Sequence, residues 1–117
     1  MSLAAAPVAA QEAAPSGQPM VLWQVLWERI EGAETQAVFR FIAPGLGGVA
    51  PEIATADLDW LCETHAAPVA GLTYARSDTV VLTLMDRPVP RGETDPEAVQ
   101  FFGAYRIEDG ACLPEEF

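Results

Sequence analysis

Two cysteines, Cys62 and Cys112, restrict the fold of this chain of 117 residues more than any other feature. One cysteine pair in a small exported domain is most simply a disulfide, and here the bond would close a loop of about fifty residues. In the chain-entropy model this closure stabilises the fold by about 4 kcal/mol, against a usual net stability of ~5–15 kcal/mol. The alternative is two unrelated buried thiols. A redox site is not indicated, because the sequence has no Cys-x-x-Cys motif.

The N-terminal stretch suggests export. Residues 1–19 are rich in Ala and Pro, and Val8 and Ala10 precede Gln11 and Glu12 as small residues precede the cleavage site of a secretory signal. The basic and strongly apolar parts of a signal are missing, so a flexible leader is the alternative. With either interpretation we predict that residues 1–19 are disordered and that residues 20–117 form one domain. The paired cysteines and this stretch predict a periplasmic or secreted protein.

The charge balance narrows the range of partners. Seventeen acidic residues face six basic ones, for a formal net charge of −11. This charge repels nucleic-acid phosphates and anionic lipid, so we expect no nucleic-acid partner. The acidity serves solubility or, alternatively, an acidic face for a protein partner. No apolar run approaches the ~18–20 residues that span a bilayer, so no membrane span is expected.

The first half of the chain predicts a strand pair followed by a helix. Residues 20–30 are rich in Trp and Val and apolar on both alternating faces, and the side chains of residues 35–42 also alternate. These patterns favour two strands around a hairpin loop at residues 31–34. A Gly- and Pro-rich loop follows. Thr55 is then a good N-cap for a short helix over residues 55–66 that ends before Pro68.

One face of this predicted helix is apolar and carries the first cysteine. Asp57 and Asp59 would lie in the first turn, where the helix dipole favours acids. The residues at spacings of three and four define the inward face and place the cysteine toward the sheet. They are Leu58, Leu61, Cys62 and His65.

The second half predicts strands. Residues 69–75 form a weak strand candidate and residues 79–85 a clear one. After a Pro-rich loop, residues 99–107 favour a strand, although Asp95-Pro96-Glu97 could also begin a helix. Asp109-Gly110 is a strong hairpin signal. Together these elements predict an α+β fold in which one helix packs on one face of an antiparallel sheet of five to six strands.

Several phrases of the sequence resemble a known family. They are Leu61-Cys62-Glu63-Thr64, Asp86-Arg87-Pro88-Val89-Pro90, Asp95-Pro96-Glu97-Ala98, Gln100-Phe101-Phe102-x-Ala104-Tyr105-Arg106 and the late Cys112. Over residues 19–117 the chain resembles short, uncharacterised exported proteins of alphaproteobacteria of the Rhodobacter–Roseobacter group, a domain of unknown function. The resemblance implies a signal peptide and a recurrent cysteine pair, and it implies no activity.

Some relatives in that group carry an acetolactate synthase label, which the residues contradict. Thiamine diphosphate enzymes of that class bind the magnesium diphosphate through Gly-Asp-Gly and a pair of Asn about thirty residues later. This chain lacks that motif, contains no Asn, and is several-fold too short. We therefore expect neither this activity nor its cofactor, and no other cofactor is indicated.

Residues capable of chemistry are few and scattered. His65 is the only histidine, and on an apolar helix face it is more often packed than catalytic. Asp57, Asp59 and Glu63 form an acidic cluster without a calcium-binding loop, so a solvated face is expected. One histidine and two distant cysteines lack zinc spacing. The sequence therefore predicts no catalytic residue and no metal site.

Two features suggest contacts with a partner. Arg87 and Arg91 flank a Pro-x-Pro segment and could bind an anion or a partner, although pairing with neighbouring acids is the simpler interpretation. Trp23 and Trp27 share one face of the first predicted strand and have few polar partners there. Left uncovered by the helix, they would form an aromatic interface.

We therefore expect a small exported, non-catalytic module for binding or assembly, with an unknown protein partner. The alternative is a small-molecule-binding protein or a small hydrolase with a site near His65. That alternative requires a pocket lined by the histidine.

Overall fold

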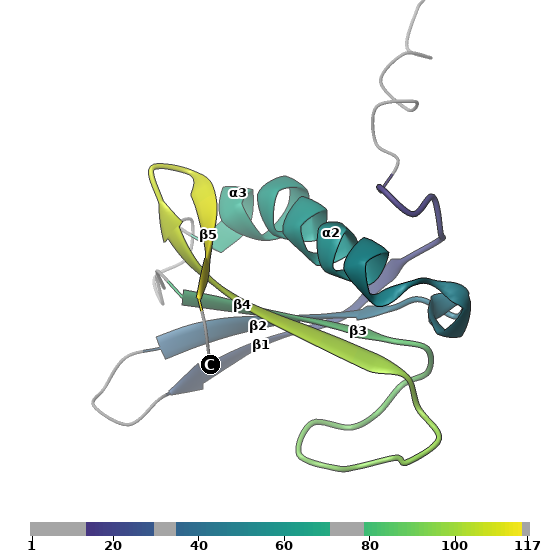
Figure 1. Cartoon of the computed structure of the whole chain (residues 1–117). Coiled ribbons are helices and arrows are strands. Elements are labelled where there is room, and N and C mark those ends of the chain that lie inside the picture. Colours follow the sequence, from purple (N-terminus) through teal and green to yellow (C-terminus); the bar gives the residue numbers. More distant parts are fainter. Residues whose placement is uncertain (1–13, 30–34, 71–78, 116–117) are drawn as a thin grey trace, which may run out of the picture.

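The computed structural model describes residues 14–29, 35–70 and 79–115, arranged as one sheet with one helix across it (Figure 1). The strands are β1 (Val21–Arg29), β2 (Thr35–Ile42), β3 (Thr79–Met85), β4 (Gln100–Glu108) and β5 (Ala111–Glu115). The helical elements are a 3-10 turn (Leu46–Gly48), α2 (Pro51–Leu61), the π-helical segment η2 (Cys62–Ala66) and α3 (Ala67–Ala70). The last three follow one another without a break. The predicted α+β class, with five strands and a helix on one face, is confirmed.

The strands lie in chain order, β1-β2-β3-β4-β5. Three neighbouring pairs are antiparallel, as predicted, but β2 and β3 are parallel, so the sheet is mixed. The physical reason is the helix, which carries the chain back across one face so that β3 starts at the same end of the sheet as β2. The predicted hairpin loop at residues 31–34 lies outside the described residues.

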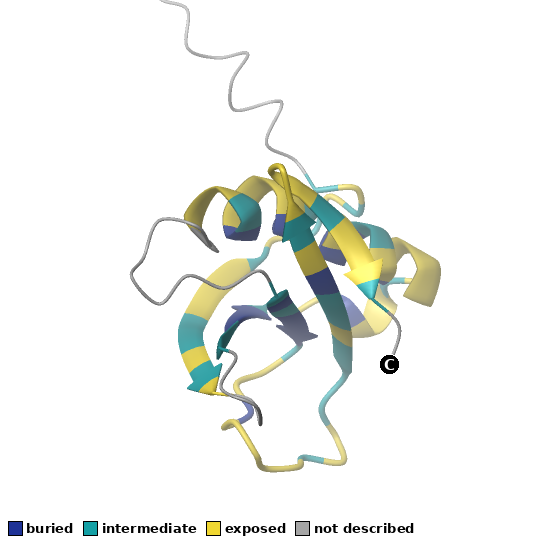
Figure 2. Cartoon of the chain, turned by 90° about the vertical axis from the view of Figure 1, so that its left-hand side faces the viewer, coloured by how far each residue is buried: buried dark blue, intermediate teal, exposed yellow. Residues whose placement is uncertain are grey.

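Side-chain alternation gives the sheet a helix-covered face and an opposite face. The core lies under the helix, and Figure 2 shows the buried residues on the central strands and on the side of the helix toward them. The strands contribute Ala37, Phe39, Phe41, Val80, Leu82, Leu84 and Tyr105, and the helix contributes Ala54, Leu58, Leu61, Cys62 and Ala66. Full burial of one large apolar side chain stabilises a fold by roughly 1.5–3 kcal/mol, so this layer holds helix and sheet together.

The helix begins earlier than the sequence analysis predicted. Its N-cap is Ala50 and its first residue is Pro51, whose fixed φ and missing N–H suit the first helical position. Thr55 is therefore not the N-cap: it lies one turn inside the helix, where its hydroxyl donates to the carbonyl of Pro51 at 3.0 Å. The good capping residue misled the prediction because a hydroxyl can also bond back to the preceding turn.

The helix also passes through Pro68, where the sequence predicted its end. A proline inside an α-helix lacks the N–H for the bond to the fourth preceding carbonyl and crowds that carbonyl. The wider π turn of η2 ends two residues before it, and the N–H of Ala67 bonds to the carbonyl of Cys62, five residues back. The helix then runs to Ala70. Of the weak strand predicted over residues 69–75, the first two residues are thus helical, and residues 71–75 lie outside the described residues.

The C-terminal part agrees with the prediction of strands. The segment Asp95-Pro96-Glu97 forms a turn instead of starting a helix: a carboxylate oxygen of Asp95 accepts the N–H of Glu97, and its carbonyl accepts the N–H of Ala98. Between β4 and β5, Asp109 and Gly110 adopt φ angles of 52° and 80°. Two positive φ angles are required by a type I′ hairpin turn, which explains the Asp-Gly pair.

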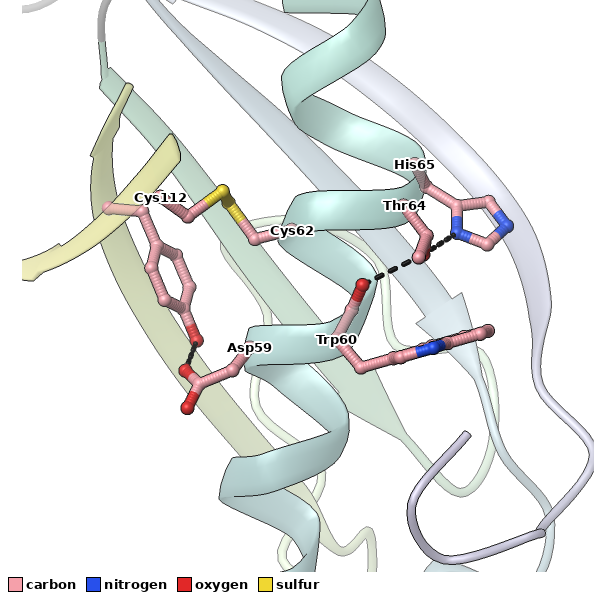
Figure 3. The surroundings of a disulfide bond; sticks show 7 residues. Asp59, Trp60, Cys62, Thr64, His65 and Cys112 are labelled. Carbon is pink, nitrogen blue, oxygen red and sulfur yellow. Dashed lines mark hydrogen bonds between the residues drawn. A yellow bond between two sulfur atoms is a disulfide. The ribbon is translucent and has the colours of Figure 1, made fainter. Parts of the chain in front are cut away.

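The predicted disulfide is present. Cys62 and Cys112 are joined with their Cα atoms 6.3 Å apart, and Figure 3 shows the bond between the helix and β5. Cys62 is fully buried at the first position of η2, and Cys112 packs against the core. The bond therefore ties the middle of the helix to the last strand.

The first prediction concerns this bond. Replacing both cysteines (Cys62→Ser with Cys112→Ser) should lower the free energy of unfolding by about 4 kcal/mol, because the unfolded chain regains the entropy of a loop of about fifty residues. Urea unfolding of the oxidised protein and of the double variant measures the difference. The oxidised protein treated with reductant should match the variant. Two free thiols in a non-reducing mass measurement of the exported protein would refute the disulfide.

Candidate functional site

A pocket of about 300 Å³ lies between the helix, the start of β1 and the segment of residues 14–20 that precedes this strand. We call it the His65 pocket. Its lining residues are Ala14, Gly17, Gln18, Met20, Leu22, Phe41, Trp60, Leu61 and His65. The volume is at the lower end of the range for small-molecule sites, and the walls combine apolar side chains with the polar groups of Gln18 and His65.

The π-helical segment positions the two ring side chains of the pocket. In a regular α-helix, residues five apart differ by about 140° around the axis and project in different directions. The i to i+5 geometry of η2 instead brings Trp60 and His65 to one side of the helix, with ring centroids 5.6 Å apart (Figure 3). The imidazole also meets Phe41 of β2 edge-on, again with 5.6 Å between centroids. The irregular turn that accommodates Pro68 therefore also builds this wall.

A short chain of hydrogen bonds holds the imidazole. The hydroxyl of Thr64 donates to the carbonyl of Trp60 at 2.7 Å, and its oxygen lies 2.8 Å from Nδ1 of His65. Both bonds are drawn in Figure 3. His65 is exposed rather than packed in the core, so it is accessible to a molecule in the pocket.

The segment of residues 14–20, which forms another wall of the His65 pocket, is held by a buried carboxylate. Asp57 is fully buried, and its two oxygens accept the N–H of Ser16 at 2.9 Å, the hydroxyl of Ser16 at 2.5 Å and the amide of Gln18 at 2.9 Å. The described fold therefore starts at residue 14, ahead of the predicted domain boundary at residue 20. Three bonds to one ionised group, each stronger than a neutral pair, fix this segment beside the helix.

In the predicted acidic cluster on the helix, Asp59 and Glu63 are exposed, as expected for a solvated face, whereas Asp57 is buried. Besides the buried Asp57, Asp59 accepts the hydroxyl of Tyr105 at 2.7 Å and links the helix to β4. Burial, and then the neighbouring carboxylate of Asp59, raise the pKa of Tyr105 well above its ordinary value, so its hydroxyl stays a donor at neutral pH. Gly103 is required beside this ring, because an added Cβ would lie 2.9 Å from it. The sequence did carry a signal for Asp57, which falls on the buried stripe of Ala54, Leu58 and Leu61.

The two arginines predicted to contact a partner are both paired within the chain. Arg91 donates from two nitrogens to the carboxylate of Glu28 at 2.6 and 2.8 Å, and this bond lowers the pKa of Glu28. Arg87 bonds in the same two-pronged way to its neighbour Asp86, at 3.2 Å each. Local pairing was the simpler interpretation for both, but no sequence pattern indicated the distant partner Glu28.

A third arginine, Arg40, holds the loop of residues 86–99, which carries Arg87 and Arg91. The sequence analysis did not single it out. Arg40 of β2 is 3 % exposed and lies on the face of the sheet away from the helix. Its guanidinium donates to the side chain of Gln24, at 2.6 Å, and to the carbonyl of Val89, and lies 5.1 Å from the ring of Trp23. Burial lowers its pKa. The cation thus binds β1 and the 86–99 loop together.

A second hollow, of about 460 Å³, opens on the same face. Its lining residues are Gln36, Val81, Arg91 and Phe102. Phe102 is half exposed there, and the guanidinium of Arg91 is held by Glu28. This hollow offers a ligand no free charge, because its one charged lining residue, Arg91, is already paired with Glu28.

The two tryptophans predicted to share a face lie on opposite faces of β1. The pairing of β1 with β2 shifts between Leu22 and Gln24, where Trp23 is the extra residue of a bulge. Trp23 therefore turns to the face of Arg40, whereas Trp27 pairs with the core residue Ala37 on the helix side. Each is a little more than a third exposed. One bulge cancels the strict alternation on which the prediction of a shared patch depended.

Neither metal ligation nor a membrane helix is found in the described part of the chain. No three acidic, histidine or cysteine side chains of residues 14–29, 35–70 and 79–115 come together in a way that could hold a metal ion. Within the same ranges, no helix is both long and apolar enough to cross a membrane.

Fold and pocket together define a small α+β domain with a disulfide between its helix and its last strand. The chain belongs to the family of unknown function DUF6497, whose model matches residues 1–117. No curated protein matches the chain. No solved structure matches it either.

The second prediction tests the wall held by the buried carboxylate. Asp57→Asn should lower the free energy of unfolding by about 1–3 kcal/mol, because the amide turns a donor toward groups that themselves donate. Hydrogen exchange of the Ser16 amide should also become faster. Urea unfolding and hydrogen exchange measure these effects.

The matched control is Glu108→Gln, which removes an exposed carboxylate and should change stability by less than about 0.5 kcal/mol. Equal effects of the two substitutions would contradict the proposed role of Asp57.

Proposed function

We propose that this protein is an exported, non-catalytic binding module that holds a small molecule in the His65 pocket. The observation that carries this proposal is the pocket itself, whose aromatic and aliphatic walls also present the amide of Gln18 and one accessible imidazole. The small-molecule alternative of the sequence analysis required a pocket lined by His65, and the structure has such a pocket. Apolar walls with few polar groups are typical of ligand sites.

The lining favours binding over catalysis. His65 is the only titratable residue among those that line the pocket, and its Nδ1 is bonded to a hydroxyl instead of a carboxylate. A general base is normally oriented by an acidic partner and placed near a nucleophile. Neither group is among the lining residues, and the two cysteines are bonded to each other.

Export is supported by the disulfide and by the Ala- and Pro-rich stretch at the start of the chain. Disulfides persist in oxidising compartments such as the bacterial periplasm and are rare in the cytosol. A periplasmic or secreted location is therefore part of the proposal.

The two surfaces suggested by the sequence support a protein partner less well. Arg87 and Arg91 already hold carboxylates, so an anionic partner would have to displace them. Trp23 and Trp27 do not form one patch, because the bulge in β1 separates them.

The third prediction tests the pocket. In a screen of small aromatic and aliphatic compounds by NMR, ligands should shift the signals of the lining residues. Trp60→Leu should weaken binding at least tenfold, since the indole forms one wall of the pocket. Phe102→Leu, a substitution in the second hollow, is the matched control and should leave the affinity unchanged. Binding that responds to Phe102 and not to Trp60 would move the site to the other face.

A protein partner at the outer edge of β1 is a second candidate, on one specific observation. β1 ends the described sheet, so one of its edges lacks a neighbouring strand. Four of the eight exposed large apolar side chains among the described residues belong to β1: Val21, Leu22, Trp23 and Trp27. An extended segment of a partner could add a strand there. At the other end of the sheet, β5 is short and carries Pro114, which protects an edge from such pairing.

The fourth prediction tests this edge. A partner captured from the periplasm by the tagged protein should be lost with Trp27→Lys, because the charge would be buried on pairing. It should be retained with Leu113→Lys, a matched change of an exposed residue on β5. If no captured protein distinguishes the two variants, the edge is not a docking site.

A further inference from the structure

The hydrogen bonds of Thr64 determine which nitrogen of His65 carries the proton. A hydroxyl has one proton to donate, and a carbonyl oxygen can only accept. Since the hydroxyl of Thr64 donates to the carbonyl of Trp60 at 2.7 Å, its proton is already used. The Thr64 oxygen must then accept in its 2.8 Å contact with Nδ1 of His65. In the neutral ring, Nδ1 therefore carries the hydrogen, and Nε2 keeps a free lone pair.

This lone pair belongs to a side chain that lines the pocket. Nε2 is on the side of the ring away from Thr64, as Figure 3 shows, and no described residue forms a hydrogen bond with it. The ring is fixed against Phe41 and Trp60, so the direction of Nε2 is set before a ligand arrives. A fixed acceptor loses little conformational entropy on binding.

The other lining residues narrow the ligand further. No lysine or arginine lines the pocket, and the chain carries a net charge of −11, so an anion has no partner there. The walls combine the rings of Phe41 and Trp60 and several aliphatic side chains with the amide of Gln18, and a volume of about 300 Å³ admits only a compact molecule. A free acceptor on the pocket wall favours molecules with an N–H or O–H group, because a ligand that covers Nε2 without donating to it leaves that nitrogen unpaired, at a cost of about 1–3 kcal/mol.

We infer that the His65 pocket binds a compact aromatic molecule, neutral or cationic, that donates an N–H or O–H hydrogen bond to Nε2 of His65. This inference rests on the proposed function, and it assigns Thr64 as the residue that positions the acceptor. Thr64 does not touch the ligand. It acts by holding the imidazole in one tautomer and one orientation.

The fifth prediction tests the tautomer without any ligand. His65 is the only histidine, so a long-range ¹H–¹⁵N spectrum shows one imidazole. At about pH 8, above the ordinary titration range of histidine, this spectrum should show the Nδ1–H tautomer. Thr64→Val keeps the shape and should give a mixture of tautomers, whereas Thr64→Ser should restore the wild-type spectrum. An Nε2–H tautomer in the wild-type protein would overturn the inference.

Ligand probes separate this inference from the proposed function. Indole and phenol should bind, whereas 1-methylindole, which has no N–H, and benzoate, an anion, should bind at least tenfold more weakly. Thr64→Val should weaken the binding of indole several-fold, and Thr64→Ser should not. If indole and 1-methylindole bind equally well in the pocket, the binding function stands and the donor requirement fails. If none of the four probes binds, both proposals fail, even where the spectrum shows the Nδ1–H tautomer.

Discussion

The attachment of the helix to the C-terminal strands is the constraint on which the rest of the structure depends. The disulfide joins Cys62 to β5, and three residues earlier Asp59 accepts the hydroxyl of Tyr105 on β4. A covalent bond and a partly buried hydrogen bond thus act on one helical turn. They fix how the helix lies on the sheet, and the apolar core fills the space between them.

Next to this attachment, the helix departs from α geometry, and the departure shapes the pocket. Pro68 lacks the N–H that a regular helix would use, and the π turn before it accommodates the irregularity. The same turn places His65 beside Trp60 and over the edge of Phe41. The irregularity at Pro68 thus affects the preceding turn of the helix, where the imidazole of His65 lies next to two aromatic rings.

Two buried charged groups fasten the remaining irregular segments to this framework. On the helix side, Asp57 holds the segment around Ser16 through three hydrogen bonds. On the opposite face, Arg40 holds the 86–99 loop through the carbonyl of Val89. Both groups are buried; Asp57 bonds only to the segment around Ser16, whereas Arg40 bonds to Gln24 of β1 as well as to the loop. Breaking such an arrangement is costly, because it leaves an unsatisfied charge in the interior.

The sequence by itself determined the elements whose pattern is local. Alternation and turn residues located β1, β2, β3 and β4, the Asp-Gly hairpin, and the face of the helix that carries Cys62. The start of the helix was misplaced because Thr55 is a better cap than Ala50 on local grounds, although Pro51 was the available signal. Tertiary structure alone decided the parallel pairing of β2 with β3, the bulge that separates Trp23 from Trp27, and the bonds of Asp57 and Arg40. Each of these depends on contacts between residues far apart in the chain, and local periodicity carries no information about such partners.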